Sequence, residues 1–245
     1  MLRPCRPNCR RSISGTFAHA GRKFGVRSLG QFGVRLWNSK RGTLDRTVAY
    51  ERKDTFYKKA KQEGYRSRSA YKLIELNKEF RFLKLGDRAV DLGSWPGGWV
   101  QVAASAVGKT GRIVGIDLVA LAPVTLMQVT LFQGDATDPV QQGKILTALS
   151  GPADVVLSDM SPKLSGIRER DDTRAMALCR AALTCAQVFL RPGGALALKV
   201  FMGAEYQAFV AELREAFLTV KMTRPEATRK GSAETYVLAT GWRKS

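Results

Sequence analysis

From residue 88 onward, short continuous apolar runs alternate with longer stretches of helical period. Continuous apolar runs are typical of strands buried on both faces of a parallel sheet. We predict strands at Arg88–Leu92, Arg112–Asp117, Val129–Gln133, Asp154–Asp159, Ala195–Val200, Val220–Thr223 and Thr235–Thr240. We predict the helices between them at Gly98–Val107, Pro139–Leu149, Asp172–Leu190 and Ala204–Ala216. This order predicts an α/β, Rossmann-like fold with a seven-stranded, mostly parallel sheet and helices on both faces.

Two features depart from the simple alternation. The last two strands are separated only by residues 225–232, without a crossover helix, which predicts an antiparallel hairpin at the sheet edge. Ahead of the sheet, residues 54–63 and 69–80 have a helical pattern, and Ser69 is placed to cap the second helix. The linker between these two helices, residues 64–68, is both basic and aromatic.

Charge favours a polyanionic partner. The chain has 245 residues, with 40 Lys and Arg against 21 Asp and Glu, a net charge of +19. Such an excess indicates nucleic acid, although a merely soluble basic surface is the alternative. Residues 1–44 hold ten basic residues and no acidic one, so removing those ten charges leaves +9 for residues 45–245.

The first 48 residues are rich in Arg, Ser and Gly and show no sustained period. We interpret residues 1–48 as an unstructured extension without chemistry, and residues 49–245 as the folded domain. A mitochondrial-type presequence, a basic RNA-binding arm and a start site further downstream are alternatives for this extension. The chain has no apolar segment of membrane-spanning length. We therefore expect a cytoplasmic protein, or one in the mitochondrial matrix if the extension is a presequence.

The number and positions of the histidine and cysteine residues exclude several kinds of chemistry. The only histidine is His19, in the extension, so the body has no histidine base and no histidine metal ligand. Cys179 and Cys185 lie in an apolar helical stretch, whereas Cys5 and Cys9 have no further ligands nearby. We expect neither a disulfide framework nor a metal site.

A glycine-rich turn links the first strand to its helix in Val90-Asp91-Leu92-Gly93-Ser94-Trp95-Pro96-Gly97-Gly98-Trp99. Asp117 ends the next strand, where an acid can accept hydrogen bonds from a ribose diol. The turn lacks the G-x-G-x-x-G pattern that faces a pyrophosphate, so S-adenosylmethionine (SAM) suits it better than a dinucleotide. Asp135 follows the third strand, where SAM enzymes place an acid or amide beside the adenine amino group, although it could instead cap the next helix. Asp117 could also be a simple turn residue.

Charged residues also meet the carboxyl ends of the central strands, where open α/β sheets bind ligands. Asp159 closes the apolar run from Val155, and Lys199 closes the run from Ala195. Lys72 lies in the second helix and Glu234 opens the last strand. We single out this set of two lysines and two carboxylates as the candidate reaction centre.

From about Tyr57 to the C-terminus the chain resembles the FtsJ family of RNA ribose 2′-O-methyltransferases. The resemblance rests on D-L-G-x-x-P-G-G-W at Asp91–Trp99, on S-D-M-S-P-K at Ser158–Lys163, and on the Lys72, Asp159, Lys199 and Glu234 set. The chain departs from the family at Lys163, where asparagine is usual, and at Ser94-Trp95, where small residues are usual. The resemblance implies that SAM binds at Gly97, Trp99, Asp117, Asp135 and Asp159.

In the reaction that the resemblance implies, a ribose 2′-hydroxyl must lose its proton as it takes the methyl group. We expect Lys199 to be the base, and Lys72 to lower the pKa of Lys199 and to orient the ribose. We expect Asp159 and Glu234 to orient the reacting groups through hydrogen bonds. The alternative is that Lys199 stays charged and only positions the hydroxyl.

Short family members without an added domain modify a uridine of large-subunit ribosomal RNA, acting on the assembled subunit. This chain is similar to them in length, so we expect that substrate and a monomer; tRNA, an mRNA cap, or non-catalytic RNA binding are alternatives. A nicotinamide-dependent oxidoreductase is disfavoured by the glycine-rich turn. Tyr65 or Tyr71 could stack a base. Phosphates are expected to meet Arg66, Arg68, Lys72, Arg224, Arg229 and Lys230.

Overall fold

A computed structural model of the chain describes residues 55–163, 165–229 and 231–243. The predicted extension at residues 1–48, its boundary with residues 49–245, and Lys230 lie outside these ranges. Within them, no helix is long and apolar enough to cross a membrane.

Seven strands form a single sheet in the order β3-β2-β1-β4-β5-β7-β6. Strands β1 to β5 pair in parallel, and β7 runs antiparallel to both β5 and β6. The predicted mostly parallel sheet and its antiparallel hairpin at the edge are therefore confirmed. The strand bounds are β1 Arg88–Leu92, β2 Arg112–Asp117, β3 Val129–Gln133, β4 Ala153–Ser158, β5 Leu190–Phe201, β6 Phe217–Thr223 and β7 Glu234–Trp242.

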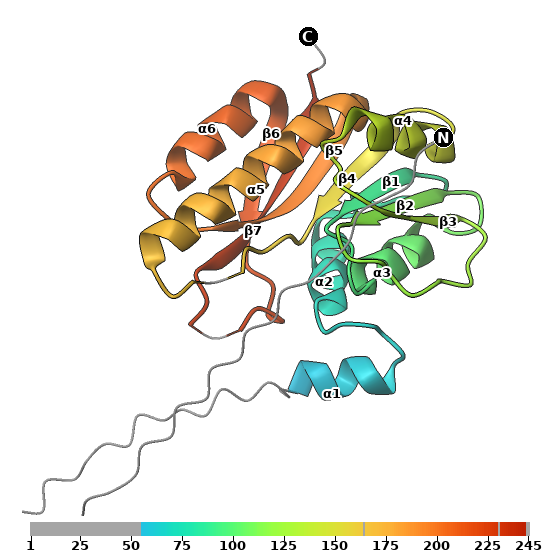
Figure 1. The fold of residues 1–245 in the computed structure, drawn as a ribbon, viewed down its shortest axis with the longest axis horizontal. Helices are drawn as coiled ribbons and strands as arrows, with labels where there is room; N and C mark the ends of the chain where they lie inside the picture. The colour runs from blue at the N-terminus through green and yellow to red at the C-terminus, as the bar shows by residue number, and fades with distance from the viewer. Residues whose placement is uncertain (1–54, 164, 230, 244–245) are drawn as a thin grey trace, which may run out of the picture. The chain divides into compact units, whose positions relative to one another are not determined.

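Helices cover both faces of the sheet, as the apolar runs of the strands require. Figure 1 shows α4, α5 and α6 on one side of the sheet and α2 and α3 on the other. Strand residues alternate between these layers, so that Val90 packs toward α4 and α5 while its neighbour Ala89 packs toward α2 and α3. The helix bounds are α1 Thr55–Gln62, α2 Ala70–Phe80, α3 Gly98–Val107, α4 Pro139–Leu149, α5 Arg168–Phe189 and α6 Tyr206–Ala216.

The sheet order reverses at β1, because β2 and β3 lie on one side of it and β4 and β5 on the other. Ligands of open α/β sheets bind at such a switch point, outside the carboxyl ends of the strands. The register aligns Leu92 with Ile116 and Ser158, and Ser158 with Leu198. The next residues along these four strands are Gly93, Asp117, Asp159 and Lys199, and they therefore lie at one common edge of the sheet.

Most differences from the predicted elements lie at their ends. Helix α5 begins at Arg168, four residues before its predicted start. The prediction missed this first turn because the turn is polar and shows no apolar period. Glu169 and Asp171 in this turn suit the positive end of the helix dipole. Strand β5 begins at Leu190, which pairs with Ala153 before a register shift. Turn-forming residues 192–194 conceal this part of the strand in the sequence.

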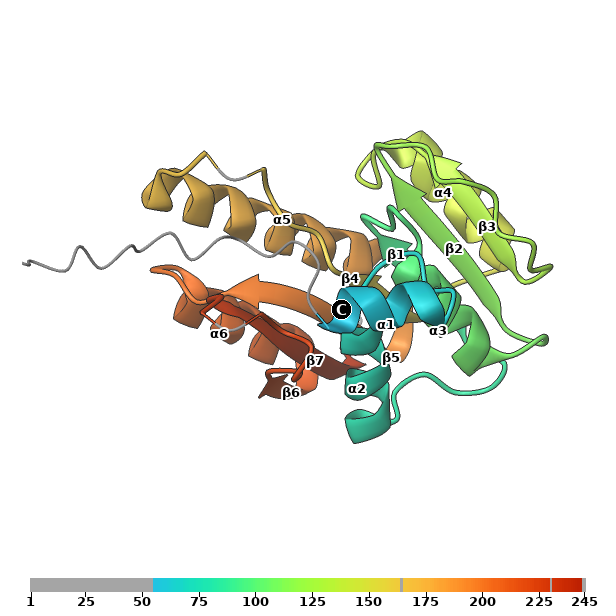
Figure 2. The same ribbon diagram turned by 90° about the horizontal axis from the view of Figure 1, so that it is seen from below.

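The predicted capping role of Ser69 is wrong. Ser69 has helical dihedral angles and makes no capping hydrogen bond to α2. The first amide groups of the helix instead donate to backbone carbonyls one turn earlier, as from Lys72 to Ser69 at 3.0 Å. The Ser69 hydroxyl pairs with the Ser67 hydroxyl at 2.7 Å, which leaves both side chains facing the glycine-rich turn. Helices α2 and α3 contact each other on one face of the sheet, which is turned toward the viewer in Figure 2.

Candidate active site

Two buried ion pairs bring the four predicted charged residues together. Lys199 Nζ lies 3.1 Å from Asp159 Oδ1 and donates to the Asp159 main-chain oxygen at 2.7 Å. Lys72 Nζ lies 2.7 Å from Glu234 Oε1, across 162 positions of sequence. The exposed fractions of Lys72 and Lys199 are only 8% and 7%. Each ammonium group therefore has a carboxylate as its partner in place of water.

Tyr236 connects these two pairs, although no role is predicted for it from the sequence. Its hydroxyl donates to Asp159 Oδ1 at 2.6 Å, and Lys72 Nζ lies 5.4 Å from the centre of its ring. The side chain is fully buried, and burial raises its pKa well above the ordinary value, assisted by the Asp159 and Glu234 charges. The phenol therefore remains a neutral donor.

A signal for Tyr236 was present in the sequence. It lies two residues after Glu234 on one strand, so both side chains project from the same face of β7. The antiparallel register then places Tyr236 opposite Lys199.

A cavity of about 680 Å³ lies beside this cluster, at the carboxyl ends of β1, β2 and β4. Its size is within the usual range for a small-molecule site. Three of the predicted cofactor residues line it: Asp117, Asp135 and Asp159. Leu118, Met160 and Ala181 add apolar walls.

Two of the aspartates that line this cavity, Asp117 and Asp135, are held by hydrogen bonds from nearby loops. Asp117 accepts hydrogen bonds from the Trp95 amide at 2.9 Å and the Val119 amide at 2.8 Å. Asp135 accepts from the amide and the hydroxyl of Thr137, and these bonds lower the pKa of Asp135. Asp138, not Asp135, caps α4, so the capping alternative for Asp135 is wrong.

The other two predicted cofactor residues, Gly97 and Trp99, lie elsewhere in the turn. Gly97 has φ +110°, and an added Cβ would come within 2.9 Å of the Arg66 side chain. Trp99 is buried and its indole donates to the Ser69 oxygen at 2.9 Å, which joins α3 to the start of α2. Neither residue lines the larger cavity, and their contact with a cofactor stays a prediction.

A smaller cavity, of about 30 Å³, lies under the glycine-rich turn and is lined by Trp99, Ser67 and Asp91 among others. Asp91 is 1% exposed, and its Oδ2 atom has no hydrogen-bond partner among the described residues. Burial, with the Asp159 and Asp117 charges, raises the pKa of Asp91 well above the ordinary value. The Ser94 hydroxyl beside it is also buried and has no partner in the described part of the chain. The space is large enough for one small polar group.

Three arginines that were expected to face phosphate donate hydrogen bonds to loop carbonyls. Arg66 donates to the carbonyls of Ala122 and Pro123 at 2.6 and 2.5 Å, Arg68 donates to the Ala227 carbonyl, and Arg224 to the Ser232 carbonyl at 2.7 Å. These contacts tie the linker before α2 and the β6–β7 connection in place. Guanidinium groups have five donors, so a phosphate contact remains a prediction for them.

Tyr71 is wrong as a base-stacking residue because it is buried. Its exposed fraction is 5%, and it packs against Phe56 and Tyr65 at ring distances of 5.5 and 5.7 Å. Its hydroxyl donates to Glu63, and burial followed by that bond raises its pKa to about 12. Tyr65 is only partly buried and remains the candidate.

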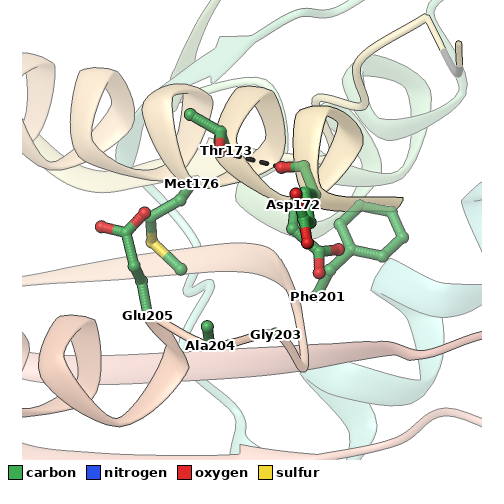
Figure 3. Close-up of a pocket in the computed structure, with 8 residues that line it drawn as sticks. Asp172, Thr173, Met176, Phe201, Gly203, Ala204 and Glu205 are labelled. Carbon is green, nitrogen blue, oxygen red and sulfur yellow. Dashed lines mark hydrogen bonds between the residues drawn. The ribbon is translucent and has the colours of Figure 1, made fainter. Parts of the chain in front are cut away.

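An acidic pocket of about 170 Å³ lies between α5 and the β5–α6 connection (Figure 3). Two of its three carboxylates are already partnered: Asp172 lies 3.9 Å from Arg168, and Glu205 lies 2.6 Å from Arg180. Among the described residues, no group of three or more His, Cys, Asp or Glu side chains could hold a metal ion. The reaction-centre cluster, not this pocket, gathers the predicted residues.

Comparison with known proteins identifies close relatives. A model of FtsJ-like methyltransferases matches residues 65–242. The chain is 46% identical to ribosomal RNA large subunit methyltransferase E of Methanothrix thermoacetophila, over 78% of this chain and 73% of that protein. It is 42% identical to the protein of that name from Syntrophobacter fumaroxidans, over 81% of this chain and all of that one. A crystal structure described as a ribosomal RNA methyltransferase from Plasmodium falciparum superposes with a TM-score of 0.65 at 26% identity, over 74% of this chain and all of that chain.

Proposed function

The chain belongs to the FtsJ-like methyltransferase family, and from this premise we propose that it methylates the 2′-hydroxyl of a ribose in large-subunit ribosomal RNA, with SAM as the methyl donor. We extend the proposal to a uridine as the target nucleotide. The assembled subunit is the proposed partner, and the protein acts as a cytoplasmic monomer. The observation that carries the proposal is the Lys199–Asp159 ion pair at the rim of the 680 Å³ cavity.

The residues around the two cavities fit SAM. A carboxylate can accept several hydrogen bonds, so Asp117 and Asp135 retain capacity for ribose hydroxyls and an adenine amino group. The unpartnered Oδ2 of Asp91 suits the ammonium group of the methionine part. SAM supplies a methyl group already activated by its positive sulfonium.

The side chains around the hydroxyl supply position and proton transfer. Holding a nucleophile in line with its target can contribute about 7–11 kcal/mol, and a general base adds roughly 10²–10⁴-fold in rate. We assign the base to Lys199, which accepts the hydroxyl proton as the neutral amine and whose Nζ is positioned by Asp159. Tyr236 in turn orients Asp159 through a hydrogen bond of 2.6 Å.

Lys72 and Glu234 are assigned to the ribose side of the site. Their Nζ–Oε1 distance of 2.7 Å ties the second helix, α2, to the opening residue of β7. We propose that Lys72 orients the ribose and that Glu234 fixes the position of Lys72. The Lys72 ammonium is also a partner for the adjoining RNA phosphate.

The test of this function is a map of ribose 2′-O-methylation across ribosomal RNA in a strain that lacks the gene. One large-subunit position should lose its methyl group and regain it when the wild-type gene, but not a Lys199→Ala version, is returned. Methylation at all other positions serves as the internal control. An unchanged map, with methyl groups lost instead from tRNA or an mRNA cap, would redirect the proposal to that RNA.

Calorimetry separates this enzyme from the other classes. The purified protein should bind SAM and show no heat with NAD. A non-catalytic RNA-binding protein would bind RNA without transferring a labelled methyl group to isolated large subunits.

A further inference from the structure

Trp95 is a large aromatic side chain left open to solvent inside the candidate site. Its exposed fraction is 58%, whereas Trp99, four positions later on α3, is 3% exposed. Its backbone is held, because the Trp95 amide donates to Asp117 at 2.9 Å. The indole is therefore presented from a fixed point of the turn without packing into the core.

The two cavities of the site meet at this residue. Among the residues that the structure describes, three line both the 680 Å³ cavity and the 30 Å³ cavity: Gly93, Trp95 and Asp159. The larger cavity continues to Asp117, Asp135 and Leu118, and the smaller one ends at Asp91 and Ser94. A ligand whose nucleoside fills the larger cavity and whose ammonium group enters the smaller one has its middle atoms at this junction.

The chemistry of the junction suits a cation. Gly93 offers no side chain, so the groups facing the ligand there are the Asp159 carboxylate and the Trp95 indole. An aromatic face attracts a cation within about 6 Å, and tryptophan does so most strongly. Asp159 is already paired with Lys199, so its negative charge is shared between Lys199 and a bound cation. The Trp95 indole adds a further attraction for that cation.

We propose that Trp95 recognises the sulfonium of the cofactor and makes the site selective for the charged donor over the neutral thioether that remains after methyl transfer. This inference rests on the proposed function, because it takes SAM as the ligand of the two cavities. SAM and S-adenosylhomocysteine share the nucleoside, the ammonium and the carboxylate. The ratio of their affinities therefore isolates the sulfonium and its methyl group. An aromatic face of this kind is worth about three- to thirtyfold in affinity for a cation.

The experiment is isothermal titration of SAM, S-adenosylhomocysteine and sinefungin, in which a protonated amine replaces the sulfonium, into the wild-type protein and two variants at Trp95. Trp95→Ala should weaken SAM and sinefungin by about fivefold or more and S-adenosylhomocysteine by no more than about twofold. Trp95→Phe should fall between, because phenylalanine has the weaker aromatic face. The exposed position and the retained amide allow both variants to fold, which thermal melting verifies.

Leu118→Ala is the matched control. Leu118 is also exposed, at 71%, but it lines only the larger cavity. Loss of the Leu118 side chain should lower the affinity for all three ligands by the same factor. A Trp95→Ala variant with the same uniform loss, or with no loss, would overturn the role of Trp95 while SAM binding by the wild type upholds the proposed function. A wild-type protein that binds none of the three ligands would overturn both.

Discussion

Tyr236 donates its hydroxyl to Asp159 Oδ1 at 2.6 Å, and Lys199 Nζ approaches the same oxygen at 3.1 Å. One carboxylate oxygen thus has a neutral donor on one side and an ammonium on the other. Because the phenol is buried and keeps its proton, it orients Asp159 without competing for charge. The position of Lys199 therefore depends on Tyr236 through the carboxylate of Asp159.

Lys199→Ala should reduce methyl transfer by about 10²–10⁴-fold, the usual contribution of a general base. SAM affinity, measured by calorimetry, should change little because Lys199 faces the hydroxyl and not the adenosine. Lys199→Arg distinguishes the two roles that the residue could have. Arginine keeps the charge but does not lose its proton in a protein, so this variant should be nearly inactive. Near-wild-type turnover would assign Lys199 the role of a positioning cation.

Tyr236→Phe should lower kcat by about tenfold with a small effect on the Kd for SAM, because Asp159 loses its fixed orientation. The free energy of unfolding should fall by about 1.5–3 kcal/mol, the usual cost of a lost hydrogen bond to a charged group. Single-turnover kinetics and urea unfolding measure the two effects. Tyr206→Phe is the control: this buried phenol donates to Met222 Sδ, away from the reaction centre. It should leave kcat unchanged, and equal kcat losses in both variants would assign Tyr236 a purely structural role.

Lys72→Met should destabilise the fold by about 3–5 kcal/mol, because it leaves the buried Glu234 carboxylate without its partner. The side chains of the pair are only 10% and 13% exposed. Glu234→Gln added to Lys72→Met should recover much of this loss but not RNA methylation, since the cation is still absent. A double-mutant cycle on stability and on kcat measures both effects. Recovery of activity in the double variant would show that the pair serves the fold alone.

Asp91 makes the unfolding free energy depend on pH. Its pKa is raised by burial and by Asp159 and Asp117, so the folded state holds a proton that the unfolded state releases above about pH 4. Stability from this group is therefore full below about pH 4 and falls as pH rises toward the folded pKa. Asp91→Asn cannot ionise, so its advantage over the wild type should widen from pH 4 to pH 8 in urea titrations. A constant difference across that range would contradict a raised pKa.

Asp91→Asn should also lower the affinity for SAM, because an amide cannot supply the negative charge that an ammonium group favours. Calorimetry of SAM with Asp91→Asn at pH 7.5 measures this loss. If the Asp91→Asn variant is more stable than the wild type but binds SAM more weakly, the wild type carries a destabilising buried acid because cofactor recognition requires it.

Local pattern alone determined the strands and the edge where the chemistry gathers. Apolar runs such as Ala195–Leu198 are followed by a charged residue, and parallel strands present their carboxyl ends on one side. Asp159, Lys199, Asp117 and Asp135 could therefore be selected from the sequence. The element ends at Arg168 and Leu190 were missed, because polar first turns and glycine-rich segments have no apolar period.

Only the tertiary structure decided which of these groups touch. The Tyr236–Asp159 hydrogen bond spans 77 positions and the Lys72–Glu234 pair spans 162. The Arg66 guanidinium reaches carbonyls 56 and 57 residues away. Such contacts depend on strand order, register and side-chain rotamers, which are set by packing over the whole sheet. The sequence thus determined the residue types at the site, and the sheet register determined their partners, because a hydrogen bond requires its two atoms within about 3 Å and no local period specifies that distance.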